Sequence, residues 1–136
     1  MAVATAMIAA GATVTLPVAT ADSSICPQVG TSCGFYSPSH RIDCEIDTGG
    51  RTGPDSLYCK TVEPAQSATM DGRGTVTTCT GVSCLGNAAE DTPTLAYGQS
   101  VSVGPFQCLS QRTGMTCTAA TGRGFVISTA GITMVG

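Results

Sequence analysis

Eight cysteines constrain this 136-residue chain more than any other feature of its sequence. The chain has 17 Gly, 3 Phe, 3 Tyr and no Trp, so few large side chains are available to build a core. Small domains with such cores are commonly held together by disulfides. Eight cysteines allow many connectivities, but their spacing favours four local pairs. These pairs are Cys26 with Cys33, Cys44 with Cys59, Cys79 with Cys84, and Cys108 with Cys117.

Zinc coordination is the alternative use of these cysteines. Structural zinc sites use closely spaced Cys-x-x-Cys pairs, or Cys and His in finger spacing. This chain has no Cys-x-x-Cys sequence and a single histidine, His40. We therefore expect no metal, no cofactor and no redox-active dithiol.

The N-terminal 21 residues carry no charged side chain and no histidine, and they end in Ala19-Thr20-Ala21. An uncharged core closed by a small-x-small tripeptide is typical of a secretory signal peptide. The alternative, a transmembrane helix, would need a more apolar segment without Pro17 and with a basic flank. We expect cleavage after Ala21, and the sequence before Cys26 lacks a lipobox for lipid attachment.

The resulting organisation has three parts. Residues 1–21 are the signal peptide, residues 22–34 an N-terminal Cys-containing extension, and residues 35–136 a single disulfide-rich domain. The mature protein is then secreted or associated with the cell envelope, with no stable membrane span after signal cleavage. A net charge of -3 with six scattered basic residues excludes a nucleic-acid-binding surface.

Short strands account for most of the pattern after Ala21, because Thr, Val and Gly recur and apolar residues do not follow helical spacing. Residues 40–47 alternate between apolar side chains, at Ile42, Cys44 and Ile46, and charged ones. Residues 57–62 can return as an antiparallel partner after the intervening glycines. This pairing would place Cys44 opposite Cys59.

The second half of the chain predicts further hairpins. Residues 63–74 are expected to be a loop, and residues 75–79 and 82–85 a tight disulfide-linked hairpin around Gly81. Alternating apolar pairs from residue 101 onward predict a meander of short strands. The predicted fold class is therefore all-β: a small disulfide-stabilised antiparallel meander of short strands and hairpins.

The turn at Arg112 and Thr113 supports one disulfide independently. A turn centred there sets a register in which Cys108 lies opposite Cys117 on neighbouring strands. Segments 36–59 and 106–117 each contain an aromatic residue, a Cys, a turn and a second Cys. Their loops are unequal, so the sequence does not predict an internal repeat.

Four segments share a pattern with a known family: SPSHRIDC at 37–44, LYCK at 57–60, AYGQSVSVGPFQCLSQRTGMTC at 96–117 and TGRGFVIS at 121–128. The chain resembles a family of small exported Cys-rich actinobacterial proteins, common in mycobacteria and classed as a domain of unknown function. The resemblance runs from about Phe35 to the C-terminus and implies export without an activity. The chain departs from the pattern at His40-Arg41, Arg123 and Thr129.

Few residues suggest chemistry. Ser39 and His40 are expected side by side on a strand, where their side chains face opposite ways, so they form no nucleophile–base pair. Asp43, Glu45 and Asp47 line one strand face, but the sequence lacks the glycine and the final acid of a calcium loop. The same carboxylates could act on a glycan only if a substrate cleft accompanied them.

Two Gly-Arg-Gly segments, at 72–74 and 122–124, are expected simply to turn the chain. We therefore expect no enzyme, and a non-enzymatic binding module whose partner is an unknown protein or envelope component. The alternative is a secreted inhibitor that presents a disulfide-braced loop, 48–56 or 63–74, to a hydrolase. A further alternative is an enzyme whose deep pocket the sequence does not reveal.

Overall fold

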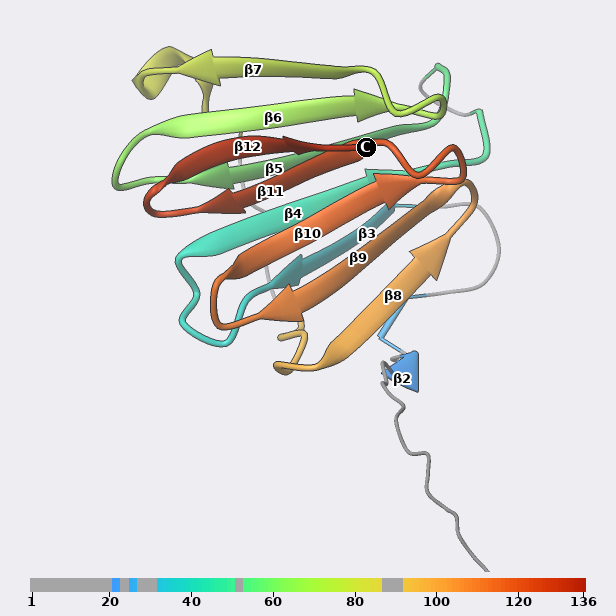
Figure 1. The fold of residues 1–136 in the computed structure, drawn as a ribbon, viewed down its shortest axis with the longest axis horizontal. Coiled ribbons are helices and arrows are strands. Elements are labelled where there is room, and N and C mark those ends of the chain that lie inside the picture. Colours follow the sequence, from blue (N-terminus) through green and yellow to red (C-terminus); the bar gives the residue numbers. More distant parts are fainter. Residues whose placement is uncertain (1–20, 23–24, 27–31, 51–52, 87–91) are drawn as a thin grey trace, which may run out of the picture.

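The computed structural model describes residues 21–22, 25–26, 32–50, 53–86 and 92–136. These residues form two β-sheets packed face to face (Figure 1). The described part has no α-helix, and its single 3-10 helix is η3 (Val82–Cys84). The all-β prediction is therefore confirmed. The predicted signal peptide lies outside the described residues except for Ala21.

Each sheet is built from five strands that follow one another along the chain. The first sheet contains β3 (Ser32–Tyr36), β4 (Ile42–Asp47), β5 (Ser56–Thr61), β6 (Gln66–Asp71) and β7 (Val76–Thr80). The second contains β8 (Gln99–Val103), β9 (Phe106–Gln111), β10 (Gly114–Ala119), β11 (Gly124–Ser128) and β12 (Gly131–Val135). A two-residue strand, β2 (Ala21–Asp22), pairs in parallel with β8.

The two sheets repeat one arrangement. In each sheet, a disulfide joins the second and third strands of the meander. Figure 1 shows that equivalent strands, such as β5 and β10, run in opposite directions. The two halves of the chain therefore share strand order and disulfide position with reversed strand directions, a structural similarity that the sequence did not predict.

The disulfides follow the local pairs expected from the sequence, and the described residues include no free cysteine. Cys44 and Cys59 are direct partners in the register of β4 and β5, and Cys108 and Cys117 are direct partners in β9 and β10. All four are at most 1% exposed. They lie in the core between the sheets, with Phe35, Phe106 and Phe125 as its largest side chains.

Two predicted elements are wrong. The predicted loop 63–74 contains strand β6, whose residues Ala68 and Met70 are fully buried. The Pro and Gly residues of this segment lie in the turns at its two ends. The strand between them is stabilised by burial of apolar side chains at alternate positions. Residues 82–84 form a 3-10 turn instead of the second strand of a hairpin, although Cys79 and Cys84 are bonded as expected.

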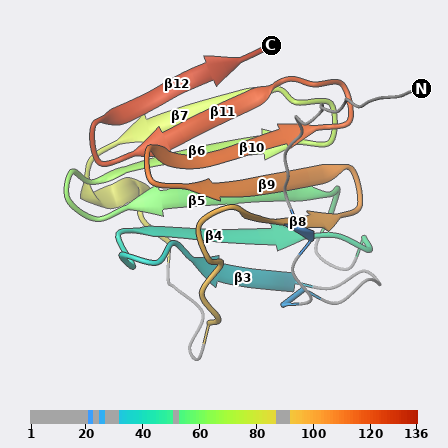
Figure 2. The same ribbon diagram turned by 60° about the horizontal axis from the view of Figure 1, so that its bottom comes forward.

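The chain leaving β7 covers part of the outer face of the first sheet. The Tyr58 hydroxyl donates to the Cys84 carbonyl at 2.9 Å and accepts from the Gly86 N–H at 2.7 Å. Farther on, residues 92–98 pass the edge of β3, where Thr94 bridges to Tyr36, before entering β8 (Figure 2). On the charged face predicted for residues 40–47, Asp43, Glu45 and Asp47 are half-buried and Arg41 is exposed.

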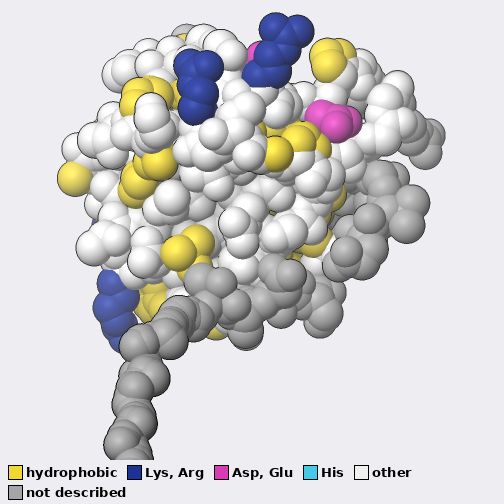
Figure 3. All heavy atoms as spheres, turned by 45° about the vertical axis from the view of Figure 1, so that its right-hand side comes forward, with side chains coloured by type: hydrophobic (Ala, Val, Ile, Leu, Met, Phe, Trp, Pro, Cys, Tyr) yellow, Lys and Arg dark blue, Asp and Glu magenta, His cyan; other side chains and the backbone are white. Residues whose placement is uncertain are grey.

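Within the described ranges, the structure contains no helix with the length and apolarity that a bilayer span requires. The face shown in Figure 3 carries separate basic side chains on a mainly uncharged polar surface.

Candidate functional site

A polar cleft lies at one end of the sandwich, where turns from both sheets meet. We call it the turn-end cleft. Its volume is about 280 Å³, and it combines the turn before β4 with the turns after β9 and β11. It is lined by Ser37, Ser39, Arg41, Ile42, Tyr97, Gln111, Arg112, Gly114, Ser128 and Thr129.

Hydrogen bonds hold the first of these turns. The buried Ser37 hydroxyl accepts from the Ile42 N–H at 3.2 Å, and the Ser37 carbonyl accepts from the His40 N–H at 2.8 Å. Ser39 Oγ lies 3.2 Å from Ser37 Oγ and accepts from the Arg41 N–H at 3.3 Å. His40 adopts a left-handed conformation with φ 61°. These bonds fix the backbone from which Arg41 projects.

His40 lies in this turn and not on a strand, which corrects the sequence-based placement. Its Nε2 atom is 3.0 Å from Thr94 Oγ1, and its ring stacks on Tyr36 with 4.6 Å between centroids. Ser39 is hydrogen-bonded to its own turn. The two neighbouring residues therefore have separate structural partners.

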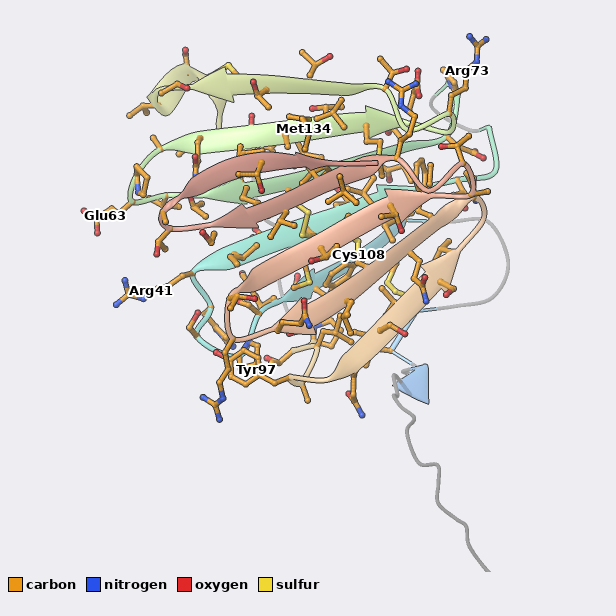
Figure 4. The ribbon with its side chains drawn as sticks, viewed as in Figure 1. Arg41, Glu63, Arg73, Tyr97, Cys108 and Met134 are labelled. Atoms are coloured by element: carbon orange, nitrogen blue, oxygen red, sulfur yellow. A yellow bond between two sulfur atoms is a disulfide. The ribbon has the colours of Figure 1, made fainter. Side chains whose placement is uncertain are left out.

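Two guanidinium groups give the cleft its charge. The Arg112 guanidinium lies 4.8 Å from the centroid of the Tyr97 ring, a cation–π contact. Figure 4 shows Arg41 and Tyr97 at the same end of the sandwich, opposite the end that carries Arg73. The ion pair found in the described part of the chain lies outside the cleft and joins Lys60 Nζ to Asp43 Oδ2 at 3.9 Å. Neither cleft arginine is neutralised by a described carboxylate.

The acidic residues singled out from the sequence lie away from this cleft. Asp43, Glu45 and Asp47 project from the outer face of β4. Burial raises the pKa of Glu45, and the neighbouring charges of Asp47 and Asp43 raise it further. Burial also raises the pKa of Asp43, while Lys60 opposes this change. The Ser32 hydroxyl donates to Asp47, so that carboxylate has a structural partner.

A cation would need ligand atoms gathered around one point. Among the described residues, one group of three His, Cys, Asp or Glu residues has its ligand atoms within 4.8 Å of one another, namely the sulfurs of Cys44, Cys59 and Cys117. Each of these sulfurs is in a disulfide, whereas zinc binds thiolates. The three carboxylates of β4 do not form such a cluster.

The two Gly-Arg-Gly segments contact each other at the far end of the sandwich. The Thr121 hydroxyl donates to the Arg73 carbonyl at 2.9 Å. A Cβ atom on Gly74 would lie 2.7 Å from Arg123 Cβ, so this glycine permits the close approach of the two turns. The segments therefore do more than turn the chain, because they join the two sheets at this end.

A larger hollow of about 470 Å³ lies at that end and is lined by Pro54, Asp55, Asp71, Gly72 and Arg73. Its carboxylates already have backbone partners. Asp71 accepts from the N–H groups of Arg73 and Thr75 at 2.9 and 3.0 Å, and these bonds lower its pKa. Asp55 accepts from the Gly49 N–H at 3.3 Å. The turn-end cleft is the better candidate because its charged groups lack such partners.

Sequence reasoning did not select most of the cleft. Tyr97, Gln111 and Ser128 lie in segments of the resembled family pattern, but the pattern assigned them no role. They meet only because the sheets stack with these turns at one end. A partial signal existed, since Arg41 and Thr129 are two of the departures from the resembled family pattern. Both line the cleft.

Comparison with known proteins gives one match. Residues 64–134, more than half of the chain, match the model of a family of unknown function, DUF6636. This range begins before β6 and runs from there through the second sheet, from β8 to the next-to-last residue of β12. No curated protein and no solved structure matches the chain. The chain therefore belongs to the DUF6636 family.

Proposed function

We propose that this protein is a secreted or cell-envelope-associated, non-enzymatic binding module that contacts its partner through the turn-end cleft. Four disulfides support an extracellular location, because disulfides persist in oxidising compartments. The uncharged segment ending in Ala21 supports export.

One observation carries the proposed site: a polar cleft formed by three turns contains two arginines without a described acidic partner. The scaffold behind it is rigid, since disulfides cross-link the central strands of both sheets. Binding residues on loops held by a rigid scaffold are a common arrangement in recognition domains.

The partners of His40 favour binding over catalysis. A general base must reach the proton that it removes, but the His40 ring is held between Tyr36 and Thr94. The adjacent Ser39 hydroxyl is bonded within its turn. These contacts give both residues a structural role in shaping the cleft.

An inhibitor is the second candidate, and the connection between β4 and β5 favours it. The Cys44–Cys59 disulfide joins the two strands that flank this loop. Residues 51–52 lie outside the described residues. The other loop suggested from the sequence, 63–74, is unsuitable because it contains β6.

The test is capture from an envelope extract with oxidised protein that begins at Asp22. Thr129→Trp fills the cleft from an exposed position, and Ala120→Trp places the same side chain on an exposed turn at the opposite end. We expect Thr129→Trp to lose the partner and Ala120→Trp to retain it. Equal capture by both variants would contradict the proposed site. Inhibition of an extract hydrolase by both variants would support the second candidate.

A further inference from the structure

We infer that the turn-end cleft binds an acidic oligosaccharide, a short sugar chain that carries separated anionic groups. This inference rests on the proposed function and adds the chemical class of the ligand. Its elements are two available cations, polar groups without intramolecular partners, and an exposed aromatic ring.

The cations define the charge of the ligand. Arg41 and Arg112 are exposed and come from different sheets, one before β4 and one after β9. A guanidinium remains charged at any physiological pH and presents a planar set of donors to carboxylate or phosphate oxygens. Since neither has an acidic partner in the described part of the chain, both can accept an anion from a ligand.

The polar lining is suited to hydroxyl groups. Gln111 and Thr129 are exposed and line the cleft, and among the described residues the Gln111 side-chain amide and the Thr129 hydroxyl have no hydrogen-bond partner. An amide supplies both donors and acceptors, and a hydroxyl supplies one donor and two acceptor positions. Sugar hydroxyls have the same dual character, so these groups can pair with them.

Tyr97 supplies the apolar contact. The residue is 38% exposed, and its ring is held beside Arg112 by the cation–π contact. An exposed aromatic ring offers a flat surface to the C–H face of a sugar ring. The guanidinium and the ring therefore lie together where an acidic sugar would present both its charge and its apolar face.

The charges around the cleft disfavour a densely charged polyanion. Arg41 also lines a neighbouring hollow of about 200 Å³ together with His40, Val62 and Glu63. The chain as a whole has a net charge of -3. A nucleic acid or polyphosphate that extended past Arg41 would meet Glu63, whereas an oligosaccharide with isolated charges can place them at the arginines.

The experiment is calorimetric titration of the oxidised protein with three probes: trigalacturonate, neutral galactotriose and glucose 6-phosphate. We expect both anionic probes to bind more tightly than galactotriose, by about tenfold or more. Tighter binding of trigalacturonate than of the sugar phosphate would assign the anion as a carboxylate. The reverse order would contradict an oligosaccharide with separated charges, because glucose 6-phosphate is a single sugar with one anionic group.

Variants locate the binding. Arg112→Ala and Arg41→Ala should each weaken binding of the preferred anionic probe by about tenfold. Arg73→Ala and Arg123→Ala, matched in charge but placed at the opposite end, should change it less than about twofold. Thermal melts of all four variants verify that each is folded.

The inference is overturned if neither anionic probe binds, if galactotriose binds as tightly, or if the two sets of variants have equal effects. Its failure is separate from failure of the proposed function. If Thr129→Trp loses the envelope partner while no acidic probe binds, the cleft is a binding site for another ligand class.

Discussion

The Sγ atoms of Cys59 and Cys117 lie 3.8 Å apart in the core, although they belong to disulfides of different sheets. The two residues occupy equivalent positions, each on the third strand of its meander. The disulfides therefore pack on each other at the centre of the sandwich. Each one cross-links a pair of strands and also fills space against the other.

This contact predicts that the two core disulfides are energetically coupled. Replacing Cys44 and Cys59 by Ala removes a cross-link of sequence separation 15, which contributes about 3 kcal/mol in the chain-entropy model, together with core packing. When Cys108 and Cys117 are replaced by Ala in the same protein, the total loss of unfolding free energy should be about 1 kcal/mol smaller than the sum of the losses measured for each pair alone. Denaturant unfolding of the three variants measures this difference.

The control for that cycle is the Cys79–Cys84 disulfide, whose Cys79 is exposed on β7. The loss of unfolding free energy on removing this disulfide should add to the loss on removing either core disulfide, within about 0.5 kcal/mol, because the groups are not in contact. Full additivity between the two core pairs would show that the sulfur contact has no energetic role.

Gly124 permits the close packing of β10 and β11. An ideal Cβ at this position would lie 1.9 Å from the Cys117 carbonyl oxygen, so the strands must separate to accept any side chain. We expect Gly124→Ala to destabilise the domain by about 3 kcal/mol. Gly122 lies in the turn before β11, with φ +87° and open space around its Cα, and Gly122→Ala should cost about 1 kcal/mol. Similar losses in chemical denaturation would refute the steric explanation.

Ser110 is fully buried, and its hydroxyl is the one buried side-chain polar group without a hydrogen-bond partner in the described ranges. Ser110→Ala should raise the unfolding free energy by about 1 kcal/mol, because it removes an unsatisfied polar atom. Ser37→Ala is the opposite case, since it removes an acceptor used by the Ile42 N–H, and should lower stability by about 1 kcal/mol. A destabilised Ser110→Ala variant would indicate a hidden partner.

The pH dependence of stability should reflect the raised pKa of Glu45. Burial and the charges of Asp47 and Asp43 favour its neutral form in the folded protein. The wild-type protein should therefore lose stability relative to Glu45→Gln as pH rises from about 4.5 through the folded pKa, and the difference between the two should be constant at lower pH. Unfolding measured from pH 3 to about 8 tests this trend.

Asp71 should show the opposite dependence of stability on pH. Backbone N–H groups of Thr75 and Arg73 lower its pKa, so its ionised form stabilises the fold. Asp71→Asn should be less stable than wild type at neutral pH, and this difference should shrink as pH falls through the lowered pKa. Parallel pH profiles for the two variants would contradict the assignment of these carboxylates.

Reduction and metal chelation should have different effects. Four disulfides contribute about 2 to 4 kcal/mol each, and the unfolding free energy of a small domain is about 5 to 15 kcal/mol in total. Losing all four disulfides therefore removes an amount of stability comparable to this total. We expect reductant to unfold the protein and EDTA to leave its melting temperature unchanged. A large fall in melting temperature with EDTA would indicate a required metal.

The sequence determined the local pairings. Alternation at Ile42, Cys44 and Ile46 predicted β4, and the turn at Arg112 and Thr113 predicted the register of β9 and β10. These signals are readable because strand period and turn position depend on residues close together in the chain. They were enough to predict the all-β class and the four local disulfides.

The way in which these hairpins combine depends on the tertiary structure. Strand β6 was missed because its stability depends on burial of Ala68 and Met70 against the second sheet and not on a strong local pattern. The turn-end cleft brings together Arg41 and Arg112, which are 71 positions apart in the sequence, only because the two sheets stack with their turns at one end. The packing of two sheets is a non-local interaction, so no spacing within either half of the chain could specify it.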